Sequence, residues 1–167
     1  ADIGRSAGEK TVNRLNPQKA SSASVPVVYD PRVANSLVRH LAGAVNGTTV
    51  ARGTTFLKDK TGAQIFPAAI TIVDDPLRPR GLGSKSFDGE GVGTKRLDII
   101  EAGVLTSWIM DLRSARQLGL STTGHAGRGI SSPPSPTTTN LYMQASDVTP
   151  GELMSDIKAG LYVPEMM

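Results

Sequence analysis

Glycine and proline interrupt this chain so often that its helices and strands have to be short. The 18 Gly and 11 Pro are dense in two segments, 76–93 and 121–139, where apolar residues are few. Such long segments without regular structure are uncommon in compact domains and are often functional or mobile. Because aromatic residues make up only 4% of the chain, the core has to be built mostly from Val, Ile, Leu and Ala.

The clearest helix prediction follows Asp30, a favourable N-cap residue with Pro at the first helical position. Apolar residues then recur every four positions, at Val33, Leu37, Leu41 and Val45. We expect Leu37 and Leu41 to be buried on this face, and Asn46-Gly47 to end the helix. Capping residues and helical patterns predict further helices or helical turns at 3–15, 54–59, 111–118 and 149–158.

Short apolar and β-branched runs predict strands at 25–29, 70–73, 96–100, 104–110, 140–144 and 161–163. The two central runs flank Glu101-Ala102-Gly103, a connection typical of a hairpin. Because helices and strands do not alternate as βαβ units, the sequence predicts an α+β fold. We expect mainly antiparallel or mixed strands, several short helices and long Gly/Pro-rich loops. Residues 1–24 are predicted to form an N-terminal helix and linker, and 25–167 the α+β domain.

Composition excludes several classes of site and partner. The chain has no Cys, and therefore no disulfide, thiolate metal site or Cys nucleophile, which agrees with a cytoplasmic, reducing location. Its net charge of +3 comes from a loose scatter of Lys and Arg, whereas nucleic-acid binding usually shows a clustered basic face. We expect no signal peptide, and the sequence contains no apolar stretch near the ~20 residues that span a bilayer. We therefore expect no membrane contact and no nucleic-acid partner.

Residues that commonly carry catalysis are sparse. His40 lies on the clearest predicted helix, but it lacks the adjacent Glu and the second His of a zinc-peptidase helix. No Gly-x-Ser-x-Gly nucleophile motif is present. Two carboxylate pairs, Asp74 with Asp75 and Asp88 with Glu90, have the chemistry for acid–base catalysis or cation binding, although such residues at strand ends usually cap turns. A hydrolase that uses the loop of Asp88 and Glu90 stays open as an alternative.

Several motifs, taken in chain order, are similar to those of one peptidase family. They are Asp30-Pro31-Arg32-Val33-Ala34, Ala51-Arg52-Gly53-Thr54-Thr55-Phe56-Leu57, Phe87-Asp88-Gly89-Glu90-Gly91, Ile100-Glu101-Ala102-Gly103-Val104-Leu105, Ser114-Ala115-Arg116-Gln117-Leu118-Gly119, Thr123-Gly124-His125-Ala126-Gly127-Arg128, Pro134-Ser135-Pro136 and Thr139-Asn140-Leu141-Tyr142. In this order the chain resembles the TldD/PmbA peptidase family, and within it the PmbA (TldE) branch, nearly from end to end. Family members are considerably longer, so the resemblance implies an internal or C-terminal-domain fragment.

The resemblance implies a division of labour between two subunits. The TldD branch carries a His-Glu-x-x-x-His metal motif on the corresponding helix, and alignment on Gly53-Thr54 places its three metal-site positions at Val38, Arg39 and Gly43. None of these residues binds zinc. The resemblance therefore implies a subunit without catalytic or metal-binding residues, which pairs with a zinc-bearing TldD-like paralogue to degrade or trim unfolded peptides. It also implies an alternative, a regulatory module of the DNA gyrase modulator type that contacts a protein or nucleic acid.

Candidate contacts with a peptide or partner lie in or near these motifs. They are Arg39, His40, Thr123, Gly124, Arg128, Pro134 and Asn140. Arg128 offers a fork of donors suited to a carboxylate or to backbone carbonyls. Asn140 stands at the entrance of a predicted strand, where its amide can hold a neighbouring backbone. The segments 76–93 and 121–139 are candidates to line a peptide groove or a subunit interface.

Overall fold

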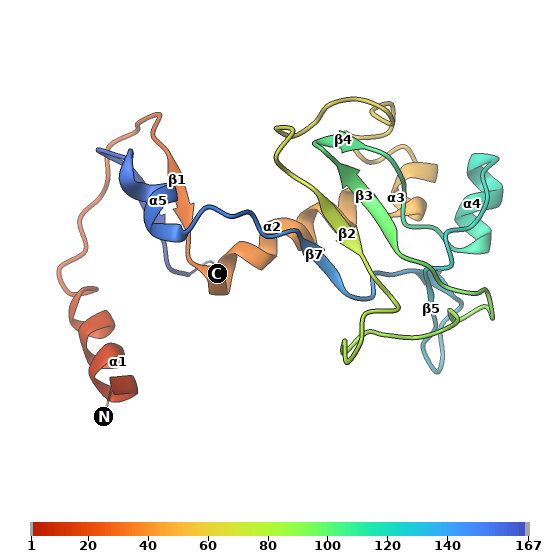
Figure 1. The fold of residues 1–167 in the computed structure, drawn as a ribbon, viewed down its shortest axis with the longest axis horizontal. Coiled ribbons are helices and arrows are strands. Elements are labelled where there is room, and N and C mark those ends of the chain that lie inside the picture. The colour runs from red at the N-terminus through yellow and green to blue at the C-terminus, as the bar shows by residue number, and fades with distance from the viewer. Residues whose placement is uncertain (1, 166–167) are drawn as a thin grey trace.

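The computed structural model describes residues 2–165 of the protein. Figure 1 shows a larger body around one sheet and a smaller lobe in which the two ends of the chain lie. The elements in chain order are α1 (Asp2–Val12), β1 (Val27–Tyr29), α2 (Pro31–Ala44), α3 (Gly47–Ala51), β2 (Ile72–Asp74), β3 (Leu97–Glu101), β4 (Val104–Leu105), α4 (Leu112–Leu118), β5 (Ala126–Gly127), β6 (Ser135–Pro136), β7 (Leu141–Met143), α5 (Pro150–Ser155) and β8 (Leu161–Val163). These short helices and mostly antiparallel strands confirm the predicted α+β class.

The central sheet has the strand order β4-β3-β2-β7, and each neighbouring pair in it is antiparallel. The predicted hairpin joins β3 to β4. Gly103 in its turn has a φ of 81°, and a Cβ atom there would overlap the backbone oxygen of Phe66, so glycine is required. β4 is shorter than the predicted strand, because the chain leaves the sheet after Leu105 and Ile109 forms an isolated bridge with Asn46.

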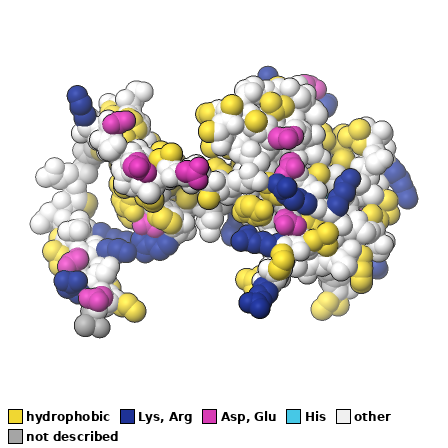
Figure 2. Space-filling view, in the orientation of Figure 1, with side chains coloured by type: hydrophobic (Ala, Val, Ile, Leu, Met, Phe, Trp, Pro, Cys, Tyr) yellow, Lys and Arg dark blue, Asp and Glu magenta, His cyan; other side chains and the backbone are white. Residues whose placement is uncertain are grey.

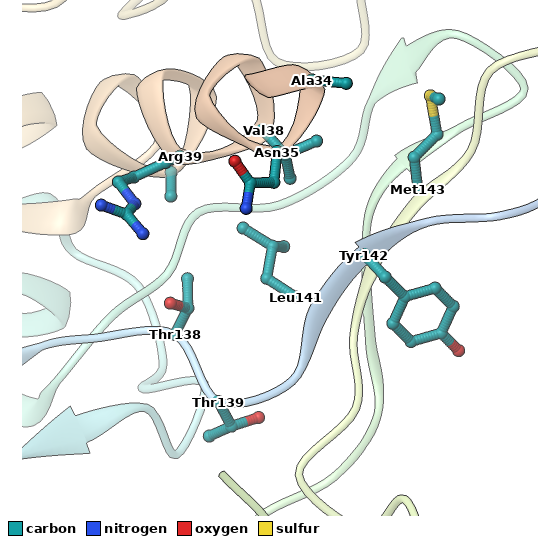
Figure 3. A pocket seen from close by; sticks show the side chains of 10 residues that line it. Ala34, Asn35, Val38, Arg39, Thr138, Thr139, Leu141, Tyr142 and Met143 are labelled. Carbon is teal, nitrogen blue, oxygen red and sulfur yellow. The ribbon is translucent and has the colours of Figure 1, made fainter. Parts of the chain in front are cut away.

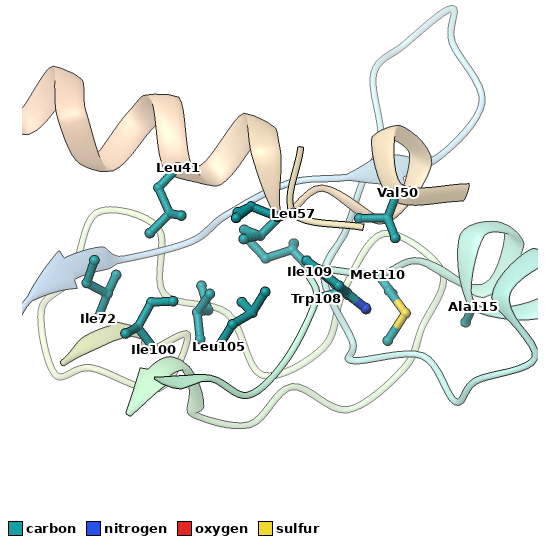
Figure 4. Packing of buried hydrophobic residues seen from close by; sticks show 12 residues of the cluster. Leu41, Val50, Leu57, Ile72, Ile100, Leu105, Trp108, Ile109, Met110 and Ala115 are labelled. Carbon is teal, nitrogen blue, oxygen red and sulfur yellow. The ribbon is translucent and has the colours of Figure 1, made fainter. Parts of the chain in front are cut away.

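The core fills the space between α2 and one face of this sheet (Figure 4). Its buried members are Leu41, Val45, Val50, Leu57, Ile72, Ile99, Ile100, Leu105, Trp108, Ile109, Met110 and Ala115. The side chain of Leu41 is 9% exposed, which confirms its predicted burial, but Leu37 is 46% exposed. The prediction for Leu37 is wrong because the first turns of α2 project beyond the sheet (Figure 1), and Leu37 instead lines an apolar surface groove with Phe56 and Met143.

Helix ends follow the capping residues with one exception. Asp111 and Thr149 form capping boxes at the starts of α4 and α5, as their sequences predict. Asn46 was predicted to stop the helix before it, but its side chain accepts a hydrogen bond from the N–H of Thr48 and so caps a further helix, α3. Residues 54–59 form turns and not the predicted helical turn, since the helical residues lie earlier, in α3.

The smaller lobe connects the start of α2 to the last strand. β1 and β8 form a parallel pair separate from the central sheet. Asp30 caps α2 and also accepts hydrogen bonds from the side chains of Arg32 and Tyr162. The bonds from Arg32, with that from Tyr162, hold the pKa of the Asp30 carboxyl well below its usual range.

α1 lies at the outer end of this lobe, and its residues are exposed (Figure 1). It ends three residues before the predicted Leu15, and Asn16 beyond it has a positive φ of 52°. Within residues 2–165, the helices are all too short or too polar to cross a bilayer.

Leu41 and Leu37 provide a matched pair for testing how α2 sits on the sheet. We expect Leu41→Ala to lower the free energy of unfolding by about 2–5 kcal/mol, because it removes core packing and leaves a cavity. The same change at Leu37 should cost less than about 0.5 kcal/mol, since its side chain is already half in solvent. Urea denaturation of both variants measures the difference, and equal losses would show that α2 is rotated about its axis.

Candidate functional site

A groove of about 480 Å³ runs between α2 and the segment that enters and forms β7 (Figure 3). We call it the α2–β7 groove. Arg39 and Thr138 lie at one end, and Ala34 and Met143 lie at the other. Its lining residues are Ala34, Asn35, Val38, Arg39, Ala42, Thr138, Thr139, Leu141, Tyr142 and Met143.

Small residues on α2 keep this groove open. Ala34 and Ala42 line it directly, and alanine side chains leave room between the helix and the strand. A second hollow of about 290 Å³ shares Arg39 and Thr138 with the groove and extends past Gly43, where the helix has no side chain at all. The two hollows therefore lie next to each other along α2.

A buried polar cluster holds the strand side of the groove. The backbone N–H of Thr139 donates to Oδ1 of Asp74 (2.8 Å), and the Thr139 hydroxyl donates to Oδ2. Nε2 of His125 lies 3.0 Å from the same Oδ2, and the side chains of Asp74 and His125 are both fully buried. Asp74 thus ties the end of β2 to the 121–139 segment and to the entrance of β7.

The hydrogen positions in this cluster follow from its acceptors. Nδ1 of His125 faces the carbonyl oxygen of Thr123 at 2.8 Å. A carbonyl oxygen only accepts, so Nδ1 carries a hydrogen. A further hydrogen has to lie between Nε2 and Oδ2 of Asp74, because two lone pairs at 3.0 Å would repel each other. His125 and Asp74 therefore form a buried hydrogen-bonded pair, out of contact with solvent.

The other carboxylates that sequence analysis left open also have structural partners. Asp88 accepts hydrogen bonds from the backbone N–H groups of Glu90, Val92 and Ala126. Burial raises the pKa of the Asp88 carboxyl, but these three bonds outweigh burial and hold the pKa below its usual value. Glu90 accepts from the N–H of Leu112 at the start of α4. Neither carboxylate lines the α2–β7 groove.

Asn140 joins the other side of β7 to the 76–93 segment. Its amide oxygen accepts from the N–H of Gly83 (2.9 Å), and its amide nitrogen donates to the backbone oxygen of Asp75 (2.7 Å) and to Oγ of Ser84 (2.9 Å). The amide therefore holds neighbouring backbone, and with these bonds Asn140 fixes the long Gly/Pro-rich segment beside the strand.

The candidate residues chosen from sequence lie on different parts of the molecule. Only Arg39 among them lines the α2–β7 groove. His40 lines the separate apolar groove that contains Leu37. Thr123 and Gly124 are buried, and the Thr123 hydroxyl holds the backbone of Met110.

Two further candidates, Arg128 and Pro134, lie in the connection between β5 and β6. Arg128 is exposed and Pro134 is half-buried. Pro134 borders a hollow of about 360 Å³ between α3 and α4. The segment itself is not a loose connector, because it contains a short antiparallel ladder and its residues His125, Ala126 and Pro136 are buried.

Sequence reasoning missed most of the groove. Thr138, Leu141 and Met143 line its strand side. Leu141 belonged to a family motif, but Thr138 and Met143 had no signal besides a short predicted strand after several threonines. The pairing of Asp74 with His125, 51 positions apart, had no local signal.

The groove residues do not fit a metal ion. At the positions where the resemblance puts metal ligands, Val38 is aliphatic, Gly43 has no side chain and Arg39 is a cation. Imidazole and carboxylate groups are the usual ligands of zinc in a site without Cys, and residues 2–165 contain no group of three or more such side chains placed to hold a metal.

Figure 2 shows Lys and Arg scattered over the visible face with Asp and Glu among them.

Comparisons with known proteins agree on one family. Residues 22–167 match the family model of the PmbA/TldA metallopeptidase C-terminal domain. The chain is 40% identical over 165 residues to the metalloprotease PmbA of Escherichia coli O157:H7, covering 99% of this chain and 35% of that protein. It is 30% identical over 152 residues to a TldD homologue of Haemophilus influenzae, covering 90% of this chain and 32% of that protein. The chain spans about a third of the length of these relatives.

Solved structures show the same fold. TldE from Thermococcus kodakarensis superposes with a TM-score of 0.78 at 25% identity, over 96% of this chain and 38% of that one. A Thermotoga maritima protein named for modulation of a DNA gyrase superposes with a TM-score of 0.82 at 27% identity, over 98% of this chain and 37% of that one.

The lowered pKa of Asp88 predicts how acid acts on the fold. In the folded chain this carboxyl ionises below its ordinary value of 3.8, so its stabilising effect is full above that value and is lost as pH falls through the folded pKa. Asp88→Asn replaces one acceptor oxygen with an amide nitrogen, and we expect it to cost about 1–3 kcal/mol at neutral pH. The gap to the wild type should narrow as the pH is lowered from about 5 to about 3.

Urea denaturation across that pH range measures the gap. Asp98→Asn is the matched control, because Asp98 makes only a partly exposed ion pair with Arg96 and should change stability little at any pH. If the difference in unfolding free energy between Asp88→Asn and the wild type stays constant or widens in acid, the lowered pKa of Asp88 would be contradicted.

Proposed function

Because this chain belongs to the PmbA/TldD metallopeptidase family, whose C-terminal domain it matches over residues 22–167, we propose that it is part of a peptidase subunit that binds no metal and works with a metal-bearing paralogue. In this proposal the chain is the C-terminal domain of a longer protein. The pair acts in the cytoplasm on unfolded peptides. Zinc and the catalytic residues belong to the paralogue.

One observation carries the proposal. Arg39, at a position where the TldD branch is expected to have a metal-site residue, projects from α2 at the groove end that Thr138 borders (Figure 3). A guanidinium stays protonated in proteins and repels a cation. The groove architecture of a peptidase is thus combined with a side chain that opposes metal binding, which supports a non-catalytic subunit.

Such a subunit would form part of the substrate-binding groove of a two-subunit enzyme. A groove of about 480 Å³ lies in the size range of ligand clefts, about 300–1,000 Å³, and is bounded by a helix and a strand held by the Asp74 cluster. A hollow of this volume holds a few residues of an extended chain and is too small for a folded domain. This supports a preference for unfolded peptides.

Mixing the protein with a paralogue that carries His-Glu-x-x-x-His tests the proposal. We expect the two proteins to co-purify and the mixture to cleave an unfolded peptide, since the metal and base come from the paralogue. This protein alone should show no cleavage with added zinc. The matched control is the paralogue with its motif Glu changed to Gln, which should still co-purify but leave the mixture inactive. Cleavage by this protein alone, or failure of the two proteins to associate, would contradict the proposal.

Arg128 tests whether the exposed turn between β5 and β6 acts through a partner or substrate. We expect Arg128→Ala to reduce peptide cleavage by the mixed subunits, because it removes donors suited to a carboxylate or to backbone carbonyls. Its effect on the unfolding free energy should stay below about 0.5 kcal/mol, since Arg128 is exposed. Arg116→Ala, at an exposed position of α4, is the control and should change neither quantity. Normal cleavage by the Arg128 variant would remove this turn from the proposed surface.

A further inference from the structure

β7 presents an open backbone edge to the α2–β7 groove. The carbonyl oxygen of Asn140 accepts from the N–H of Asp75, just after β2, and the N–H of Gln144 donates to the carbonyl oxygen of Thr71, just before β2. In an antiparallel pair, backbone groups point alternately toward and away from the partner strand. The N–H and C=O groups of Leu141 and Met143 therefore point away from β2. Within residues 2–165, no hydrogen bond from outside the sheet reaches these groups.

A free edge of this kind is suited to pairing with another strand. Exposed edges are usually protected in natural proteins, because they pair with any extended chain. Here the edge of Leu141 and Met143 lies inside a groove that is closed on its other side by α2 (Figure 3). Between α2 and this edge lies a hollow of about 480 Å³, which is in the size range of ligand clefts.

The groove also carries one unsatisfied positive charge. Arg39 is exposed and forms no ion pair or side-chain hydrogen bond with the described part of the chain, residues 2–165. The lining of the groove contains no Asp or Glu. A guanidinium presents a planar fork of donors that matches the two oxygens of a carboxylate. The complementary ligand group is therefore a carboxylate at the Arg39 end.

Strand direction decides which carboxylate this is. All pairs in the central sheet are antiparallel, and antiparallel pairing is slightly more stable per residue than parallel pairing. The chain passes Thr138 at the Arg39 end of the groove before it enters β7, and β7 ends at Met143 (Figure 3). A peptide antiparallel to it enters at Met143 and finishes at Arg39, so the end that meets the guanidinium is its carboxyl terminus.

We propose that the α2–β7 groove binds the C-terminal end of an extended peptide, with the peptide backbone paired to Leu141 and Met143 and its terminal carboxylate bound by Arg39. This inference deepens the proposed function, and it rests on that function for the supply of unfolded peptides. The groove would contact the backbone and the terminal carboxylate of the peptide, so it would select a free C-terminus and not a particular sequence. The subunit would thereby hold peptide ends for its catalytic partner.

Peptide binding to the protein without its paralogue tests the inference. The probe is an unstructured hexapeptide of Ala, Ser and Val with fluorescein at its N-terminus, made with either a C-terminal carboxylate or a C-terminal amide. We expect fluorescence anisotropy to show about tenfold tighter binding of the carboxylate form, because hydrogen bonds to a charged group are the stronger kind. Arg39→Gln should abolish that difference, and Arg39→Lys should retain part of it.

Arg52→Gln is the matched control. Arg52 is an exposed arginine at the end of α3 that lines a different hollow, so its loss should leave the preference for the carboxylate form intact. The melting temperature of Arg39→Gln should equal that of the wild type, since the Arg39 side chain has no hydrogen-bond or ion-pair partner among residues 2–165.

N-methylated peptides test the strand pairing separately. Two peptides are compared, one methylated on the odd-numbered amides and one on the even-numbered amides. Only one of the two should bind more weakly, because only every second peptide N–H faces β7. Equal effects of both registers would overturn the pairing.

Three outcomes would overturn the inference. They are equal affinity for the carboxylate and amide peptides, discrimination that survives in Arg39→Gln, and equally tight binding of an amidated peptide with an internal Asp. Failure here, with cleavage by the mixed subunits intact, would leave the proposed function standing. If the protein still prefers the carboxylate peptide over the amide peptide but does not associate with the paralogue, the binding site would stand and the proposed heterodimer would be wrong.

Discussion

The buried contact between Asp74 and His125 is the interaction on which the arrangement of this domain depends. It joins β2, in the middle of the central sheet, to a segment poor in apolar residues that could not hold itself by burial alone. The same carboxylate receives both the N–H and the hydroxyl of Thr139, which sets where β7 begins. Leaving any of these buried polar groups unpaired would lower the stability of the fold. The contacts therefore form together, and they hold the strand side of the groove to the central sheet.

What the sequence predicted well was local. The caps at Asp30, Asp111 and Thr149 act within a few residues of themselves, so their side-chain chemistry is enough to locate helix starts. Leu37 shows the limit of periodicity, because it belongs to the same helical stripe as Leu41 but lies where the sheet no longer covers α2. A repeat of apolar residues identifies a face, and only the tertiary arrangement decides how far along the helix that face is covered.

The site was less predictable than the fold for the same reason. The resemblance drew attention to Arg39, which is one of the residues that line the groove. The other wall comes from residues about a hundred positions later, and the motif that contains Thr139, Leu141 and Tyr142 gave no sign that they lie opposite α2. His125 and Asn140 were noticed as single polar residues, yet their partners lie in β2 and in the 76–93 segment. Non-local pairs of this kind leave no periodicity or spacing to read.

The contact of Tyr162 with Asp30 has a consequence for the order in which the protein takes shape during synthesis. The two residues are 132 positions apart, and a ribosome adds roughly 5–20 residues per second. Asp30 therefore waits on the order of 7–26 seconds for its tyrosine partner. During that interval β1 has no strand beside it, and its apolar side chains are open to other nascent chains. Within this domain, the lobe that contains β1 therefore closes only after β8 has been made, and a chaperone could protect its apolar side chains until then.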